Sequence, residues 1–109
     1  MKSKIETYLG FCVRAGKLVY GVDDIESKRK GIFLLVFDET LGENSLKALL
    51  QTQQKFSCPL MIADKEILGA YLHKPAVKAT AITDYHLATA IVNAAQSEPQ
   101  FKFYSGGNN

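Results

Sequence analysis

The side chains that most often carry metal or acid-base chemistry are few and scattered in this sequence. It contains two histidines, His73 and His86, and two cysteines, Cys12 and Cys58. The cysteines form no Cys-x-x-Cys pair, and neither histidine stands beside a cysteine or a carboxylate cluster, as zinc ligands commonly do. Motifs for a Walker loop, a dinucleotide-binding loop or a nucleophile elbow are absent from the sequence. We therefore expect no enzymatic activity, no cofactor and no bound metal.

Asp23, Asp24 and Glu26 are the densest group of carboxylates outside any recognised motif. Carboxylate oxygens bind divalent cations, so a metal site is one interpretation. A helix start is the other, because aspartate caps a first turn and negative side chains are favourable near the positive end of the helix dipole. The second interpretation is favoured, and the first stays open as an alternative.

Charge permits a nucleic-acid partner without requiring one. Thirteen Lys and Arg against eleven Asp and Glu leave a net charge of +2 in 109 residues, which is weak for a protein that wraps nucleic acid. Residues 1–30 hold a local excess of basic side chains. These are Lys2, Lys4, Arg14, Lys17, Lys28, Arg29 and Lys30.

Cysteine usage and hydropathy bear on location. Cys12 and Cys58 lie within apolar segments, where a free cysteine behaves as a small hydrophobic residue, and we expect both thiols to be buried and reduced. The first residues do not resemble a signal peptide, and no apolar run approaches the roughly 18 residues that a membrane span needs. The sequence therefore predicts a cytoplasmic protein without a membrane partner.

Helical and β-prone segments alternate along the first half of the chain. Apolar residues with helical spacing run from Ile5 to Val13, and Gly16 can end that helix. Residues 18–20 are β-prone, and Asp23 or Asp24 can cap a second helix that runs to about Gly31. The unbroken apolar run at 32–37 predicts a central strand covered on both faces.

The same alternation continues in the second half. The pattern predicts helices at about 44–57, 64–72 and 83–96, with Asp64 and the Thr83-Asp84 pair as caps, and strands at 59–63 and 77–82. We therefore expect an α/β fold, a three-layer α/β/α sandwich around a mixed sheet of about four strands. Residues 1–96 would form the single domain, and 97–109 a mobile tail, although Phe101, Phe103 and Tyr104 could dock on the body.

One stretch carries a family resemblance. Arg14-Ala-Gly-Lys-Leu-Val-Tyr-Gly21, its continuation Val-Asp-Asp-Ile, the later Leu68-Gly69 and Ala81-Ile82-Thr83-Asp84 follow one another in consistent order over roughly residues 5–95. This resembles the superfamily of ribosomal proteins L-seven-Ae and L-thirty-e, in particular its bacterial YlxQ-type branch. The resemblance implies an α/β/α sandwich that recognises kink-turns in RNA, by the glycine-led start of the second helix and by an apolar loop before the last strand.

The resemblance also implies a set of contact residues. Gly21 would let backbone approach the RNA, Asp24 would accept N–H donors of a guanine, and Ala76 and Val77 would contact an extruded base, with Lys74 and Lys78 nearby. Asp23 stands where the family pattern Gly-x-Asn-Glu-x-x-Lys has its asparagine. Arg14, Lys17 and Lys28 would neutralise phosphates, Lys28 in place of the pattern's lysine, and the following Arg29 and Lys30 extend that basic run.

Two function classes follow from this resemblance. The first is a non-catalytic RNA-binding protein, part of a ribonucleoprotein, whose partner is ribosomal RNA or a structured non-coding RNA. The alternative is a protein-protein adaptor on the same fold, with a ribosomal or other protein partner, because Asp23 and Ser27 replace the asparagine and the lysine that carry RNA contacts in the family.

Overall fold

The central strand forms where the apolar run is longest. In a computed structural model, which describes residues 3–28 and 31–104, strand β2 (Leu34–Asp38) lies between β3 (Leu60–Ala63), which is parallel to it, and β4 (Ala79–Ile82), which is antiparallel. All five residues of β2 are buried, because both faces of the sheet are covered. The strand begins two residues later than the apolar run, and it includes Asp38 at its end.

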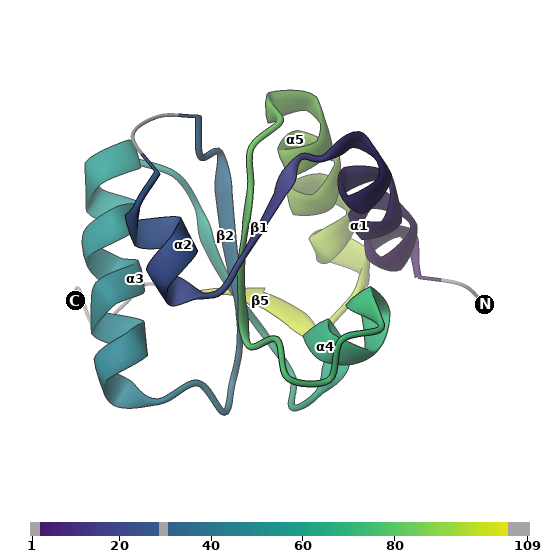
Figure 1. Cartoon of the computed structure of the whole chain (residues 1–109). Coiled ribbons are helices and arrows are strands. Elements are labelled where there is room, and N and C mark those ends of the chain that lie inside the picture. Colours follow the sequence, from purple (N-terminus) through teal and green to yellow (C-terminus); the bar gives the residue numbers. More distant parts are fainter. Residues whose placement is uncertain (1–2, 29–30, 105–109) are drawn as a thin grey trace.

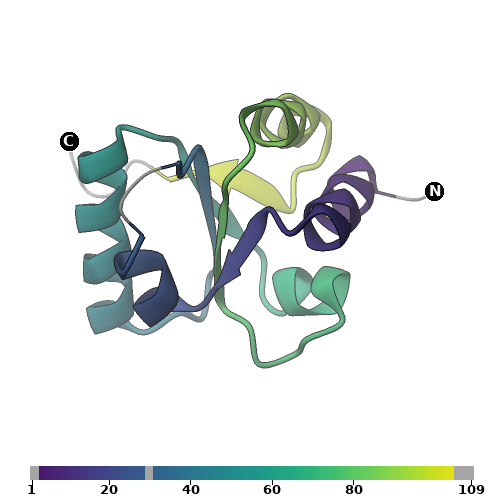
Figure 2. The same cartoon turned by 45° about the horizontal axis from the view of Figure 1, so that its top comes forward.

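Helices cover both faces of the sheet, as Figure 1 shows. The helices form two layers, one on each face of the sheet, and the turned view in Figure 2 keeps the two layers apart. The first layer is α1 (Lys4–Ala15), α4 (Ile67–Leu72) and α5 (Tyr85–Ala94), and the second is α2 (Val22–Glu26) and α3 (Glu43–Phe56). The expected three-layer α/β/α sandwich is confirmed.

The sheet has one strand more than expected. Its order is β1-β4-β2-β3-β5, with the short strands β1 (Leu18–Tyr20) and β5 (Phe101–Phe103) at the two edges. The α3 crossover joins the parallel pair β2 and β3. The fifth strand, β5, lies within residues 97–109, for which the sequence predicts a mobile tail.

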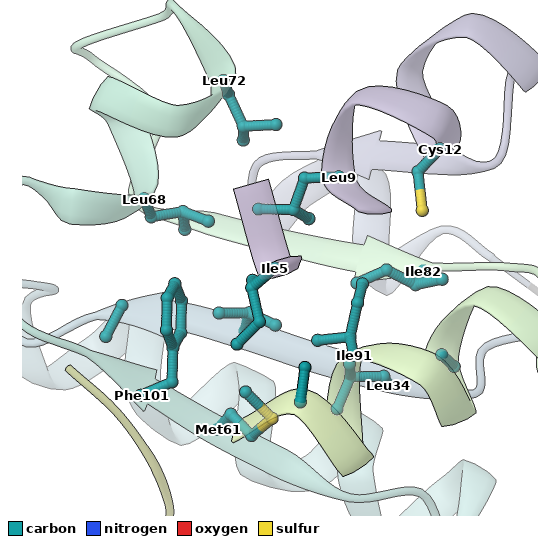
Figure 3. Close-up of a cluster of buried hydrophobic side chains, with 14 residues drawn as sticks. Ile5, Leu9, Cys12, Leu34, Met61, Leu68, Leu72, Ile82, Ile91 and Phe101 are labelled. Atoms are coloured by element: carbon teal, nitrogen blue, oxygen red, sulfur yellow. The ribbon is translucent and has the colours of Figure 1, made fainter. Parts of the chain in front are cut away.

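Each face of the sheet has its own buried core. Figure 3 shows the core under α1, α4 and α5, in which Ile5 and Leu9 of α1 face Ile91 of α5 and Leu34 of β2. On the other face, Ile25 and Leu49 from α2 and α3 pack with alternate residues of the same strands. We call these the α1-side core and the α3-side core.

The expectation of a mobile tail from residue 97 is wrong for residues 97–104. A short 3-10 helix (Ala95–Ser97) leads to β5, which pairs antiparallel with β3. Phe101 is only 2% exposed in the α1-side core, and the Tyr104 ring lies 5.2 Å from the Phe37 ring on the other face. The domain therefore extends to Tyr104, and residues 105–109 lie outside the described part of the chain.

The second helix is shorter than expected. It ends at Glu26 with Ser27 as its C-cap, and the Ser27 hydroxyl donates to the carbonyl oxygen of Asp24 at 2.8 Å. Neither Asp23 nor Asp24 caps it, since the N-cap is Gly21.

Two further caps can be compared with their predictions. Helix α4 starts later than expected, at Ile67, and Asp64 does not cap it with its side chain. Asp84 does cap α5, because its carboxylate accepts the Leu87 N–H at 2.9 Å.

Candidate nucleic-acid interface

The start of α2 is fixed by a glycine in an unusual conformation. Gly21 has φ 84° and ψ 149°, a region of backbone space that is essentially restricted to glycine. Its N–H donates to the carbonyl oxygen of Ala79 at 2.9 Å. Since Ala79 is the first residue of β4, this bond ties the start of α2 to the end of the loop that precedes β4.

The loop 73–78 is held against α4 by a second glycine. Gly69 is buried, and a Cβ there would lie 3.0 Å from the Lys74 carbonyl oxygen and 3.1 Å from Pro75 Cα. The Lys74 N–H donates to the Gly69 carbonyl oxygen at 2.9 Å, directly after His73 ends the helix with φ 57°. Close approach of the loop backbone therefore requires glycine at position 69, within the Leu68-Gly69 pair of the resemblance.

A cavity of about 320 Å³ lies where these segments meet. It is open to solvent and has three walls, the start of α2, the end of the 73–78 loop and the beginning of α3. Its lining residues are Gly21, Val22, Asp23, Leu41, Ser45, Ala76, Lys78 and Ala79. The two segments that the resemblance assigns to RNA contact thus share one cavity, which we call the α2 cavity.

Three of the predicted site residues line the α2 cavity, namely Gly21, Asp23 and Ala76. Asp24 is exposed but does not line it, so the carboxylate at the cavity is that of Asp23. Val77 is half-buried and packs against the α1-side core. Val77 does not line the α2 cavity, so of the pair Ala76 and Val77 only Ala76 does.

Arg14 and Lys17 lie at the other end of β1. The Lys17 carbonyl oxygen accepts the Thr83 N–H at 2.9 Å, next to the carboxyl end of β4, whereas Gly21 bonds to the amino end of that strand. The Arg14 guanidinium lies 5.0 Å from the centre of the Phe11 ring. Neither cation belongs to the α2 cavity.

Lys28 is also remote from the cavity. Its carbonyl oxygen lies 3.4 Å from Lys55 Nζ, in the last turn of α3, whereas the first turn of α3 lines the cavity. A helix of 14 residues is about 21 Å long. Lys28 therefore does not replace the lysine of the family pattern at this place, and Arg29 and Lys30 lie outside the described residues.

Sequence reasoning missed a polar network beside the cavity. Asp38 is 1% exposed, and its carboxylate accepts the N–H groups of Thr40 at 2.8 Å and of Glu66 at 2.7 Å, together with the Thr40 hydroxyl. Lys78 Nζ donates to that hydroxyl at 2.8 Å and lies 4.0 Å from the carboxylate. The network holds the ammonium group of Lys78 in place. The sequence signal for this network is Asp38 at the end of an apolar run. A carboxylate buried there needs hydrogen-bond partners, and so it predicts polar groups nearby.

The electrostatic environment keeps Asp38 ionised. Burial alone would raise the pKa of Asp38, but the hydrogen bonds from Thr40 and Glu66 and the charge of Lys78 outweigh it and hold the pKa below its usual value. The ion pair is half-exposed on the lysine side, so Lys78 keeps donors free for an anion at the mouth of the cavity.

The other groups considered for chemistry stay apart. In residues 3–28 and 31–104, no three His, Cys, Asp or Glu side chains converge as metal ligands would, and this includes the group of Asp23, Asp24 and Glu26. Cys12 and Cys58 are buried free thiols, as expected, and burial raises the pKa of both to about 11. Across the part of the chain that the structure describes, no helix has the length and apolar character of a membrane span.

The chain can be compared with known proteins. No family model matches it, and no curated protein matches its sequence. A solved structure described as a protein with unknown function from Bacillus halodurans C is similar in fold, with a TM-score of 0.78 and 17% sequence identity. The match covers 87% of this chain and 99% of the other. At that identity the similarity concerns the fold alone.

Proposed function

We propose that this chain is a non-catalytic RNA-binding protein of the ribosomal L-seven-Ae type, which acts in the cytoplasm on a kink-turn or similarly bulged RNA. The observation that carries the proposal is the α2 cavity. Two segments more than 50 residues apart in sequence form it together, and they are the two that the resemblance associates with RNA.

The chemistry of the cavity suits an extruded base. Asp23 supplies a carboxylate that can accept two N–H donors from a guanine edge, and the Ala76 methyl group supplies an apolar contact. The backbone at Gly21 has no side chain, and nothing lies within 4 Å of the place where one would be. Sequence-specific RNA recognition commonly uses such bases that have left the stack.

The phosphates next to that base would meet cations of the 73–78 loop. Lys78 lines the cavity, and Lys74 Nζ lies 5.5 Å from the centre of the Tyr20 ring, one residue before Gly21. Each lysine that neutralises a phosphate makes the affinity depend more steeply on salt. The placement of Lys74 and Lys78 therefore predicts salt-sensitive binding despite the small net charge.

The test is a titration of the full chain with a kink-turn RNA and with an unkinked duplex, each at low and moderate salt. We expect saturable binding to the kink-turn alone. Lys74→Glu should weaken it and lower the slope of log affinity against log salt by about one or more, whereas Lys28→Glu, the same charge change at a remote site, should leave the preference for the kink-turn unchanged. Asp23→Asn should cost about 1–3 kcal/mol of binding free energy, and Asp24→Asn much less.

Three results would contradict the proposal. Absence of binding at low salt would exclude the function and favour the adaptor alternative. Equal binding to both RNAs, or equal losses for the Lys74 and Lys28 variants, would show that only general electrostatic attraction operates.

A further inference from the structure

An apolar groove lies at the end of the sheet opposite the α2 cavity. It has a volume of about 390 Å³ and lies between α5 and the segments that lead into β2 and β3. Phe33 and Cys58-Pro59 stand at the amino ends of these strands, whereas Leu41 at the α2 cavity follows the carboxyl end of β2. With about 3.3 Å per residue, β2 alone separates the two sites by roughly 17 Å.

The groove exposes aromatic surface. Phe33 is 38% exposed and Tyr85 is 60% exposed, and their ring centres lie 5.8 Å apart in an edge-to-face arrangement. Phe56, Ala88 and Val92 add apolar surface, and none of the described lining residues carries a charge. Contiguous exposed apolar surface of this kind marks a place where a protein or a ligand docks.

Cations border the groove at the α3 end. Lys55 Nζ lies 5.4 Å from the centre of the Phe56 ring and 3.4 Å from the carbonyl oxygen of Lys28. Both lysines are exposed. Asp84 precedes the groove residue Tyr85 in sequence. Its carboxylate accepts the Leu87 N–H in the first turn of α5. The surface thus combines an apolar floor with a positive rim on one side.

We propose that this groove binds a short segment of a protein partner that carries apolar side chains and has carboxylates at one end. The apolar side chains would fill the groove between Phe33 and Tyr85, and a carboxylate would pair with Lys55. A nucleic-acid strand fits less well, because single-stranded nucleic acid is bound in grooves whose cations follow the backbone, whereas here the described cations stand at one end only. The inference does not depend on the proposed RNA site.

The first experiment uses the full chain and three short fluorescein-labelled peptides. One carries leucines followed by aspartates at one end, the second replaces aspartate by lysine, and the third replaces leucine by serine. We expect the first to bind at least about tenfold more tightly than either control, since apolar anchors and complementary charge are both required. Equal binding of the aspartate and lysine peptides would overturn the proposal.

Matched variants locate the site. Thr89→Glu places a larger, negatively charged side chain in the groove from an exposed position on α5, and Gln51→Glu adds the same side chain on an exposed face of α3. Lys55→Glu reverses the rim charge, and Lys47→Glu makes the same change two turns earlier in α3. Thr89→Glu and Lys55→Glu should reduce affinity for the aspartate peptide about tenfold, and the two controls should not. Losses that are equal for a variant and its control would overturn the proposal.

Two further measurements distinguish other occupants. Sedimentation of the free protein that shows a dimer dissociated by Thr89→Glu would assign the groove to a second copy of the chain. Displacement of the bound peptide by oligouridine would assign the groove to single-stranded RNA. Either result would overturn the proposal. Urea unfolding of Thr89→Glu with the same midpoint as the natural protein would show that a loss of peptide binding comes from the groove and not from misfolding.

Discussion

The N–H of Gly21 donates to the carbonyl oxygen of Ala79 at 2.9 Å, and this bond joins two segments that are 58 residues apart in sequence. Gly21 begins α2 and Ala79 begins β4. Because both residues line the α2 cavity, a change in the backbone conformation of either one alters the shape of the proposed RNA site.

Gly21→Ala should destabilise the fold and weaken RNA binding together. A non-glycine residue at φ 84° and ψ 149° costs about 1–3 kcal/mol, and no steric clash adds to it, because the place of the new Cβ is open. Gly10→Ala is the control, since Gly10 lies within α1 and its Cβ would make only an ordinary contact at 3.6 Å. That substitution should stabilise by about 0.5–1 kcal/mol. Urea unfolding of both variants measures the difference, and equal stabilities would contradict the assigned strain.

The fold was predictable where the apolar pattern extends over many residues. The run at 32–37 indicates a strand buried on both faces, and the helical spacing from Ile5 to Val13 indicates α1. Each element buries a continuous apolar surface, and that burial leaves a periodic pattern in the sequence. The edge strand β5 was missed because only three residues form it, and its burial comes from β3, which lies some 40 residues earlier. Periodicity within a short segment cannot report that contact.

For the candidate site, the sequence predicted which two chain segments form it but not which charged side chains lie there. Gly21 and the 73–78 loop were identified by resemblance, and they do meet at the α2 cavity. The expected cations Arg14, Lys17 and Lys28 are near Gly21 in sequence, but the fold separates them from the cavity. Strand β1 lies between Lys17 and Gly21, and Lys28 lies beside the last turn of α3. The Asp38 network was missed because its members come from three separate loops and strands.

Phe101→Ala should show that the C-terminal segment belongs to the core. Phe101 is 2% exposed in the α1-side core, and truncation of a buried phenylalanine costs about 3–5 kcal/mol. Phe103 lies two residues later on the same strand and is 55% exposed, so Phe103→Ala should change stability by less than about 0.5 kcal/mol. Urea unfolding of the two variants tests this, and similar small losses for both would mean that β5 does not seal the core in solution.

Both thiols should be nearly inert in the folded protein. Burial raises the pKa of Cys12 from 9.0 to about 11, with a contribution from the negative charge of Asp84, and burial does the same for Cys58. The thiolate is the reactive form, so at pH 8 each has about a hundredfold less of it than a thiol with a pKa of 9.0. Alkylation by iodoacetamide, followed by mass spectrometry, should be slow until urea unfolds the chain. Cys58 should react before Cys12, because it is 7% exposed and lines the apolar groove, whereas Cys12 is fully buried. Rapid modification of Cys12 in the folded protein would contradict its position.

Asp38→Asn should remove a stabilising contribution that depends on pH. The pKa of Asp38 is lower in the folded protein than its ordinary value of 3.8, so the folded state binds a proton less readily than the unfolded state. Its contribution is therefore complete above the ordinary pKa, and it is lost as the pH falls through the lower folded value. We expect the variant to be less stable than the natural protein by about 1–3 kcal/mol at pH 7, because buried donors lose a charged acceptor.

The shape of this pH dependence is the sharper test. Urea unfolding at several pH values from 7 down to about 2 should show the stability difference between the natural protein and Asp38→Asn shrinking below about pH 4. Asp64→Asn is the matched control, since Asp64 is exposed and only its backbone groups form hydrogen bonds in the described part of the chain. A difference that stays constant with pH would mean that the charge of Asp38 does not stabilise the fold. In that case Lys78 would be held at the α2 cavity by its bond to Thr40 alone.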